Sequence, residues 1–157
     1  MFCRKRIIEA TFLSVLDYGD IIYRHKGASI LKPLDSVYHS ALRFITGANF
    51  NTHHCDLYGM VGWGSLLERR NYHWHLFIYK GLVGKLPPYI SSMLCEKPSY
   101  IQTRSSDWLV LKVPFANSEL GKTAFSVSAP DSWNLLQQDF KMSYEYPSIC
   151  WSFQEFT

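Results

Sequence analysis

Apolar residues recur at helical spacing in long stretches of the first 95 residues, and this periodicity restricts the chain to a largely helical fold. The first stretch covers residues 4–23, and the second covers residues 31–46 and stops before Gly47. Apolar positions three and four residues apart predict amphipathic helices, and a glycine commonly follows a helix C-terminus. In the first stretch the stripe is formed by Ile8, Phe12, Val15 and Ile22, with Gly19 among them.

A third long helix is predicted over residues 66–82. Ser65 and Glu68 stand three residues apart directly before an apolar run, which is the spacing of a capping box at a helix N-terminus. Shorter helices are predicted on either side of it, one capped by Thr52 and reaching Met60, and one opened by the prolines at 87 and 88 and reaching residue 94.

The last third of the chain has a different pattern. Residues 108–113 alternate in part between apolar and polar side chains, and residues 122–128 form a second strand candidate. A short helix over residues 131–139 is predicted to begin at Pro130, and no clear period follows residue 140. The expected fold is therefore mainly α with a small β element near residues 108–128, a fragment that resembles a helical bundle.

Charge is unevenly distributed along the chain. Aromatic residues make up 16% of the sequence and charged residues only 18%, which argues against disorder. The net charge of +3 divides into +6 for residues 1–106 and −3 for residues 107–157. A surface that binds phosphate is therefore expected in the first two-thirds of the chain.

The cysteines and the N-terminal segment indicate an intracellular protein. The four cysteines, at positions 3, 55, 95 and 150, include no close pair, so free thiols are expected. The basic start of the chain leads into a segment with acidic residues and no small-residue cleavage site, and no apolar run is long enough to span a bilayer. We expect no signal peptide, no membrane contact, and a nuclear or cytoplasmic location.

The sequence offers two weak candidates for chemistry. His53, His54, Cys55, His73 and His75 are potential zinc ligands, but they lack the paired spacing of structural zinc sites. Asp17 and Asp20 are three residues apart on a predicted helix, yet no supporting metal ligands accompany them. We therefore expect no metal, no cofactor, no small-molecule substrate and no catalytic residue.

Basic side chains interleaved with aromatic ones are the strongest binding candidates. Cations next to aromatic rings suit contact with phosphates and stacking on bases, and the ordinary alternative is a solvated helix face beside core aromatics. The candidate residues are Arg4, Lys5, Arg6, Arg69, Arg70, Lys80 and Lys85, with Tyr72, Trp74 and Tyr79 between them.

Several segments, taken in order, resemble one known family, that of the LINE-type non-LTR retrotransposon reverse transcriptases. The resemblance lies in the region of these enzymes that follows the catalytic palm, and it covers roughly residues 4–139. The motif with most weight comprises Gly121, Lys122, Phe125, Ala129, Pro130, Trp133 and Asn134. The resembling segments are Thr11–Tyr23, Leu31–Gly47, Val61–Arg70, Phe77–Tyr89 and Glu119–Asn134.

The resemblance implies a role in holding the template–primer duplex, with residues 1–95 as a helical, thumb-like region. Residues 96–139 would form a mixed strand and helix appendage packed on it, and residues 140–157 a divergent tail. The paired Asp-Asp of the family's palm is absent from the sequence, so we expect a non-catalytic remnant of a truncated element copy. Its expected partner is RNA or an RNA/DNA duplex. The alternative is a structural or protein-interaction remnant without nucleic-acid binding.

Overall fold

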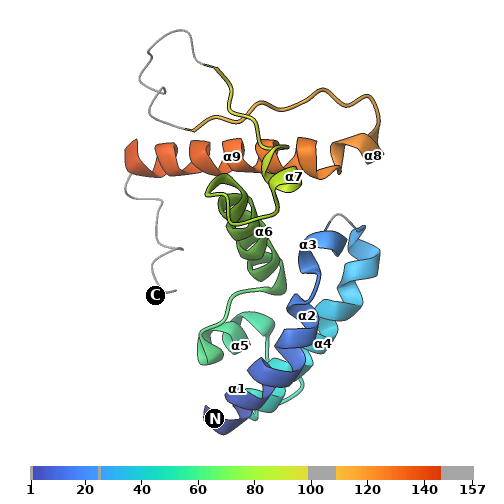
Figure 1. Ribbon diagram of the computed structural model, residues 1–157. Coiled ribbons are helices and arrows are strands. Elements are labelled where there is room, and N and C mark those ends of the chain that lie inside the picture. The colour runs from blue at the N-terminus through green and yellow to red at the C-terminus, as the bar shows by residue number, and fades with distance from the viewer. Residues whose placement is uncertain (1, 25, 99–108, 146–157) are drawn as a thin grey trace. The chain divides into compact units, whose positions relative to one another are not determined.

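The computed structural model describes residues 2–24, 26–98 and 109–145, and within them the chain is mainly α-helical (Figure 1). The longest elements are α4 (Ala28–Thr46), α6 (Leu66–Leu82) and α9 (Phe125–Glu145). The shorter ones are α1 (Phe2–Ile8), the π-helical turn η1 (Glu9–Leu13), α2 (Ser14–Asp17), α3 (Asp20–Tyr23), α5 (His54–Val61), α7 (Pro88–Ser91) and α8 (Glu119–Lys122).

The chain divides into two compact units, Met1–Trp74 and His75–Thr157. The boundary falls inside α6, so the first half of this helix belongs to the first unit and the second half to the second unit. This division differs from the boundary expected at residue 95. That expectation was based on the change in residue pattern after residue 95, whereas the observed division follows the contacts between helices. Each unit is described here by itself.

The first unit is a small helical assembly around one apolar core. The segment from α1 to α3 runs alongside α4 in the opposite direction (Figure 1), and α5 packs on α4 as well. Each helix contributes one apolar stripe, which is the pattern that buries a shared core. The buried core residues are Leu13, Leu16, Tyr38, Leu42, Ile45, Leu57, Val61 and Leu66.

The predicted helix over residues 4–23 exists but is interrupted twice. A π-helical turn occupies Glu9–Leu13, and the helix stops after Asp17. Tyr18 is extended there, with ψ 110°, and Gly19 adopts a left-handed conformation with φ 72° before α3 begins. Only glycine enters this region without a steric cost, so the glycine that the periodicity placed inside the stripe instead ends the helix.

The third predicted helix is confirmed, including its cap. The Ser65 backbone N–H donates to Glu68 Oε2 at 2.7 Å, and the Glu68 backbone N–H donates to Ser65 Oγ at 3.2 Å. Both bonds of a capping box are thus present. The helix before it begins differently from the prediction, because His53 rather than Thr52 is the N-cap residue of α5.

The small β element is not found in the described part of the chain, where an antiparallel bridge between Glu96 and Leu111 is the one β-type pairing. Trp108, at the start of the first strand candidate, lies outside the described residues. The second candidate, residues 122–128, covers the end of α8, a two-residue turn at residues 123–124 and the start of α9. The helix prevails because the Ser118 side chain caps α8 by accepting from the Gly121 N–H, and because local context overrides a weak alternation.

Candidate functional site

The basic residues of α1 all lie against aromatic rings. The Arg4 guanidinium lies 5.5 Å from the centre of the Phe44 ring, and Lys5 Nζ lies 5.4 Å from that of Trp63. Arg6 lies over the Phe2 ring and pairs with Glu9 at 3.5 Å. The rings next to Arg4 and Lys5 come from distant segments, and they are not the aromatic residues that the sequence placed among the basic ones.

Arg69 and Arg70 are engaged in ion pairs inside the first unit. Arg69 donates two hydrogen bonds to the Asp17 carboxylate, from Nε to Oδ1 at 2.8 Å and from Nη2 to Oδ2 at 2.6 Å. This hydrogen bonding is the main cause of the raised pKa of Arg69. Arg70 is only 5% exposed and lies 3.6 Å from Asp35. The two arginines hold α6 to α2 and α4, an arrangement that favours a structural role over contact with phosphate.

Asp20 completes this connection between α6 and the N-terminal helices. Its carboxylate is buried, and Oδ2 lies 2.5 Å from His73 Nδ1. Asp17, Asp20 and His73 bring potential metal-ligand atoms within 4.8 Å of one another. Asp17 already accepts two hydrogen bonds from Arg69, and Asp20 is hydrogen-bonded to His73. The cluster is therefore best described as a buried polar network that positions α6.

Lys80 and Lys85 remain solvent-exposed near the end of α6, in the second unit. The turn between them is closed by a hydrogen bond from the Lys85 N–H to the Lys80 carbonyl, with Gly84 in a left-handed conformation at φ 71°. Neither side chain forms an ion pair with any residue that the structure describes. Both ammonium groups are thus accessible to an anionic ligand.

A basic and aromatic surface at the C-terminal end of α4 was missed by the sequence reasoning. Arg43 lies over the Phe50 ring at 5.2 Å, next to the contact between Arg4 and Phe44. The rings are open to solvent, with Phe44 53% and Phe50 81% exposed. The signal was the adjacent Arg43 and Phe44 in the last helical turn before Gly47. We call Arg4, Arg43, Phe44 and Phe50 the α4-end patch.

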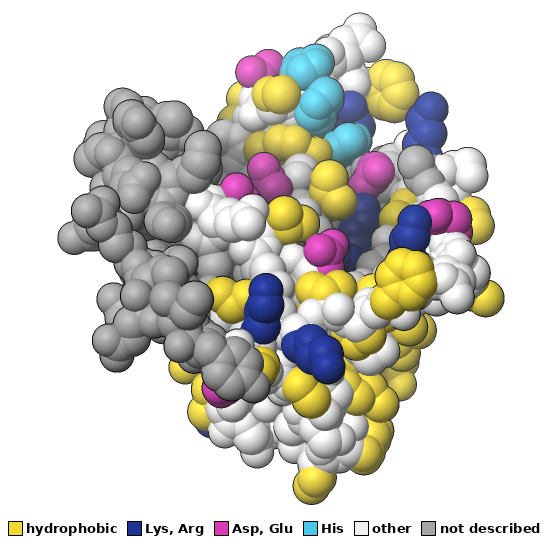
Figure 2. All heavy atoms as spheres, turned by 90° about the horizontal axis from the view of Figure 1, so that it is seen from above, with side chains coloured by type: hydrophobic (Ala, Val, Ile, Leu, Met, Phe, Trp, Pro, Cys, Tyr) yellow, Lys and Arg dark blue, Asp and Glu magenta, His cyan; other side chains and the backbone are white. Residues whose placement is uncertain are grey.

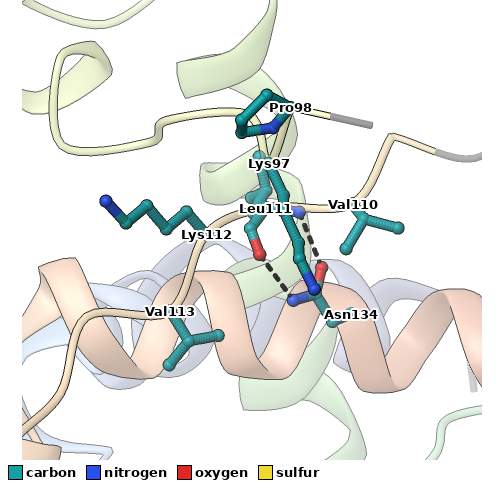
Figure 3. A pocket seen from close by; sticks show the side chains of 7 residues that line it. All are labelled: Lys97, Pro98, Val110, Leu111, Lys112, Val113 and Asn134. Atoms are coloured by element: carbon teal, nitrogen blue, oxygen red, sulfur yellow. Dashed lines mark hydrogen bonds between the residues drawn. The ribbon is translucent and has the colours of Figure 1, made fainter. Parts of the chain in front are cut away.

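Trp133 and Asn134 hold α9 to the extended segment around Leu111 in the second unit, and Figure 3 shows Asn134 beside Leu111. The Asn134 side-chain amide forms two hydrogen bonds with the backbone of Leu111. Asn134 Oδ1 accepts from the Leu111 N–H at 2.9 Å, and Asn134 Nδ2 donates to the Leu111 carbonyl at 2.8 Å. Trp133 Nε1 donates to the Leu109 carbonyl at 3.2 Å. A shallow groove surrounds this clamp, lined by Lys97, Pro98, Val110, Leu111, Lys112, Val113 and Asn134.

The sequence predicted a short helix that begins at Pro130, which would place Trp133 in its first turn. The helix in fact begins earlier, at Phe125. Trp133 lies in the interior of α9, where Pro130 is itself fully buried within the helix. Its side chain is partly buried. The indole N–H ties α9 to the extended segment at Leu109, so Trp133 joins two parts of the second unit through a hydrogen bond to backbone.

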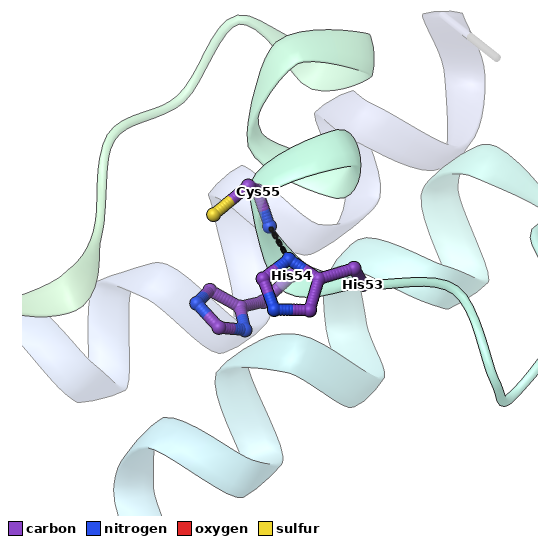
Figure 4. Close-up of side chains that lie close together, drawn as sticks. All are labelled: His53, His54 and Cys55. Atoms are coloured by element: carbon purple, nitrogen blue, oxygen red, sulfur yellow. Dashed lines mark hydrogen bonds between the residues drawn. The ribbon is translucent and has the colours of Figure 1, made fainter.

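Histidine and cysteine side chains converge at the start of α5 (Figure 4). His53, His54 and Cys55 each offer a ligand atom, and these atoms all lie within 4.8 Å of one another. The sequence reasoning dismissed this group because it lacks paired ligand spacing. The group forms because the N-cap residue, His53, leaves the helical path, which changes the direction of its side chain.

Hydrophobic side chains also reach the surface. On the face drawn in Figure 2 they lie between Lys, Arg, Asp and Glu side chains. In the first unit the most exposed include Val15, Tyr18 and Ile22, at 73%, 87% and 85%. No helix within the described residues has the length and apolar character to cross a membrane.

No protein-family model, no curated protein and no solved structure matches the chain. The arrangement of its own side chains is therefore the basis for a functional proposal.

Proposed function

We propose that the chain is a non-catalytic, nucleic-acid-binding helical fragment that contacts RNA through the α4-end patch. The observation that carries the proposal is the pairing of Arg4 with Phe44 and of Arg43 with Phe50, two cations over two exposed rings. Single-stranded nucleic acids are bound by the same combination, in which cations follow the phosphates and aromatic rings stack on bases. The resemblance to the region after the palm of LINE-type reverse transcriptases agrees with this role.

Both arginines keep most of their hydrogen-bonding capacity for a ligand. Arg4 Nη1 donates to the Phe44 carbonyl at 3.3 Å, and Arg43 Nη2 to the Thr52 carbonyl at 3.5 Å. A guanidinium carries five N–H donors, so most donors of the exposed Arg4 remain unused. Arg43 is half-buried and its Nε is enclosed without a partner, so only its terminal nitrogens are offered to a ligand. Neither arginine has a carboxylate partner in the described ranges. A phosphate would meet an uncompensated positive charge here.

The exposed rings favour unpaired bases over a uniform duplex. Phe50 buries little of its surface within the protein and Phe44 about half, and a base stacked on such a ring contributes about 1–3 kcal/mol. Bases inside a duplex are already stacked on each other. Single-stranded RNA, or the unpaired template next to an RNA/DNA duplex, is therefore the proposed ligand.

The proposed lack of catalysis rests on the carboxylates. Asp17 and Asp20 are held by Arg69 and His73, so neither is free to hold a catalytic metal ion. Primer extension or nuclease activity that survives purification, and that disappears in Asp17→Asn or Asp20→Asn, would contradict this part of the proposal.

The binding test uses fluorescence anisotropy with a labelled RNA of about 16 nucleotides. Arg4→Gln and Arg43→Gln should each weaken binding and flatten its salt dependence, because each lost phosphate contact lowers the slope of log K against log salt by about 0.7. Phe50→Ala should weaken binding without changing the slope. The matched control is Lys32→Gln, an exposed cation about 16 Å away on the same helix.

The alternative proposal is a protein-interaction role, and the exposed side chains of Val15, Tyr18 and Ile22 favour it. Val15 lies in α2, Tyr18 at the break before Gly19 and Ile22 in α3, and exposed apolar patches mark interaction sites. The two proposals separate in the same assay. RNA affinity that is absent, or that is the same in Arg43→Gln and in the Lys32→Gln control, would exclude the α4-end patch and leave the interaction role.

A further inference from the structure

We propose that His53, His54 and Cys55 form a binding site for a transition-metal ion of the zinc type. The three residues open α5, and each presents one ligand atom, all of them within 4.8 Å of one another (Figure 4). The set consists of two imidazoles and one thiol. It is independent of the α4-end patch, so the site does not rest on the proposed function.

The backbone explains how three consecutive side chains meet. Successive residues in an α-helix point about 100° apart, which would separate His53 from Cys55. His53 is the N-cap residue, however, and its extended conformation (φ −64°, ψ 145°) turns its side chain back over the first turn. Its ring centre then lies 4.0 Å from that of His54. The helix start, rather than helical periodicity, assembles the cluster.

The donor set selects the class of ion. Imidazole nitrogen and thiolate sulfur are the usual protein ligands of Zn²⁺, at about 2.0–2.1 and 2.3 Å, whereas Mg²⁺ and Ca²⁺ prefer oxygen ligands. Tetrahedral geometry at these bond lengths needs ligand atoms about 3.3–3.6 Å apart. All three side chains are exposed, so small side-chain rotations close the remaining gap. The fourth position is left to water.

Neighbouring rings restrain one of the ligands. His39 stacks on His54 with ring centres 5.4 Å apart and an angle of 23° between the planes. His39 is itself fixed, because its Nε2 lies 2.6 Å from the Tyr58 hydroxyl oxygen. Support of this kind orients metal ligands and reduces the entropy lost on binding. The cluster is thus more than a chance gathering of mobile surface side chains.

Binding replaces one weak hydrogen bond. The Cys55 N–H donates to His53 Nδ1 at 3.4 Å, which is long for such a bond. A neutral imidazole that accepts at Nδ1 carries its proton on Nε2, so the ring changes tautomer or partner when it takes a metal. The Cys55 thiol also releases its proton to become a thiolate. Both changes oppose binding, so the affinity should be moderate.

The test is a titration of the reduced full-length chain with Co²⁺ alone, followed by Zn²⁺. We expect a thiolate-to-cobalt charge-transfer absorption that saturates at one equivalent and disappears when Zn²⁺ is added. Cys55→Ser should abolish this absorption, and His53→Gln or His54→Gln should weaken Co²⁺ binding at least tenfold. Cys3→Ser and Cys95→Ser, which also replace exposed thiols, are the matched controls and should leave it unchanged.

Circular dichroism of each variant verifies that the fold is retained, since all three ligands are exposed and their replacement should not unfold the chain. No charge-transfer absorption in the parent protein would overturn the proposal. An absorption that persists in Cys55→Ser would overturn it as well, because it would assign the cobalt to another cysteine.

Discussion

Tyr38 shows how burial of one polar residue couples the fold to pH. Its ring is 1% exposed within the core of the first unit, and its hydroxyl donates to the Gly64 carbonyl at 2.9 Å. Burial raises the pKa of this phenol well above its ordinary value of 10.0. Above pH 10 the unfolded chain loses a proton from Tyr38 that the folded chain keeps. The contribution of Tyr38 to the free energy of unfolding is therefore constant below that pH and falls as the pH rises further.

Tyr38→Phe should therefore have two effects on urea unfolding. At pH 7 it should cost about 1 kcal/mol, because the Gly64 carbonyl loses its donor while the ring packing remains. Between pH 7 and about pH 11 the variant should lose less stability than the parent, since its buried ring has no proton to release. Tyr72→Phe, at an exposed tyrosine, is the control. Parallel losses in parent and Tyr38→Phe would contradict this account.

Asn134 provides a second test, in the second unit. Its amide satisfies both backbone groups of Leu111, a residue that is 1% exposed. Asn134→Ala should lower stability by about 1–3 kcal/mol, because it leaves a buried donor and acceptor without partners. The measurement is urea unfolding, with Leu135→Ala on the exposed side of the same helix as the control. Equal losses in the two variants would show that the amide clamp is unimportant.

At the scale of elements, the sequence predicted where helices lie better than how they begin and end. The capping box at Ser65 was found because both of its residues have a required type and a fixed spacing. The break at Gly19 was not found, since a glycine inside an apolar period is compatible with either a helix or a left-handed stop. The strand candidate over residues 122–128 failed because short alternations carry little information against a capped helix.

Replacing a left-handed glycine and a glycine inside a helix by alanine should change stability in opposite directions. Gly19→Ala should destabilise the chain by about 1–2 kcal/mol, because an alanine side chain resists a left-handed conformation. Gly59→Ala should stabilise it by up to about 1 kcal/mol, since Gly59 lies inside α5 and a Cβ there meets no atom within 4 Å. Thermal melts of both variants decide the matter. A stabilised Gly19→Ala would show that the two short helices prefer to be continuous.

At the scale of the whole molecule, the sequence predicted the mainly helical class but not which residues meet. Arg69 and Arg70 looked like binding residues because a linear pattern does not reveal the carboxylates opposite them, Asp17 and Asp35. Arg4 lies over the ring of Phe44, which is 40 residues away in the sequence. Long-range pairings of this kind depend on tertiary packing, which periodicity and spacing do not encode.

The two compact units lead to the last prediction, that residues 1–84 fold without the rest of the chain. Every buried residue of the first unit's core cluster lies between Leu13 and Leu66, so the cut removes none of them. The cut falls at Gly84, just beyond α6, where the backbone is already left-handed. The last two turns of α6 lose their own partners, among them those that bury Ile78, and should fray.

The fragment should unfold cooperatively in urea and show a helical circular dichroism spectrum. It contains the whole α4-end patch, so its RNA affinity should lie within about twofold of that of the full chain, as expected for independent parts. His53, His54 and Cys55 are also retained, and Co²⁺ should bind as before. A fragment that folds but no longer binds RNA would place the binding surface in residues 85–157. An unfolded fragment would show that the core of the first unit depends on contacts from the second.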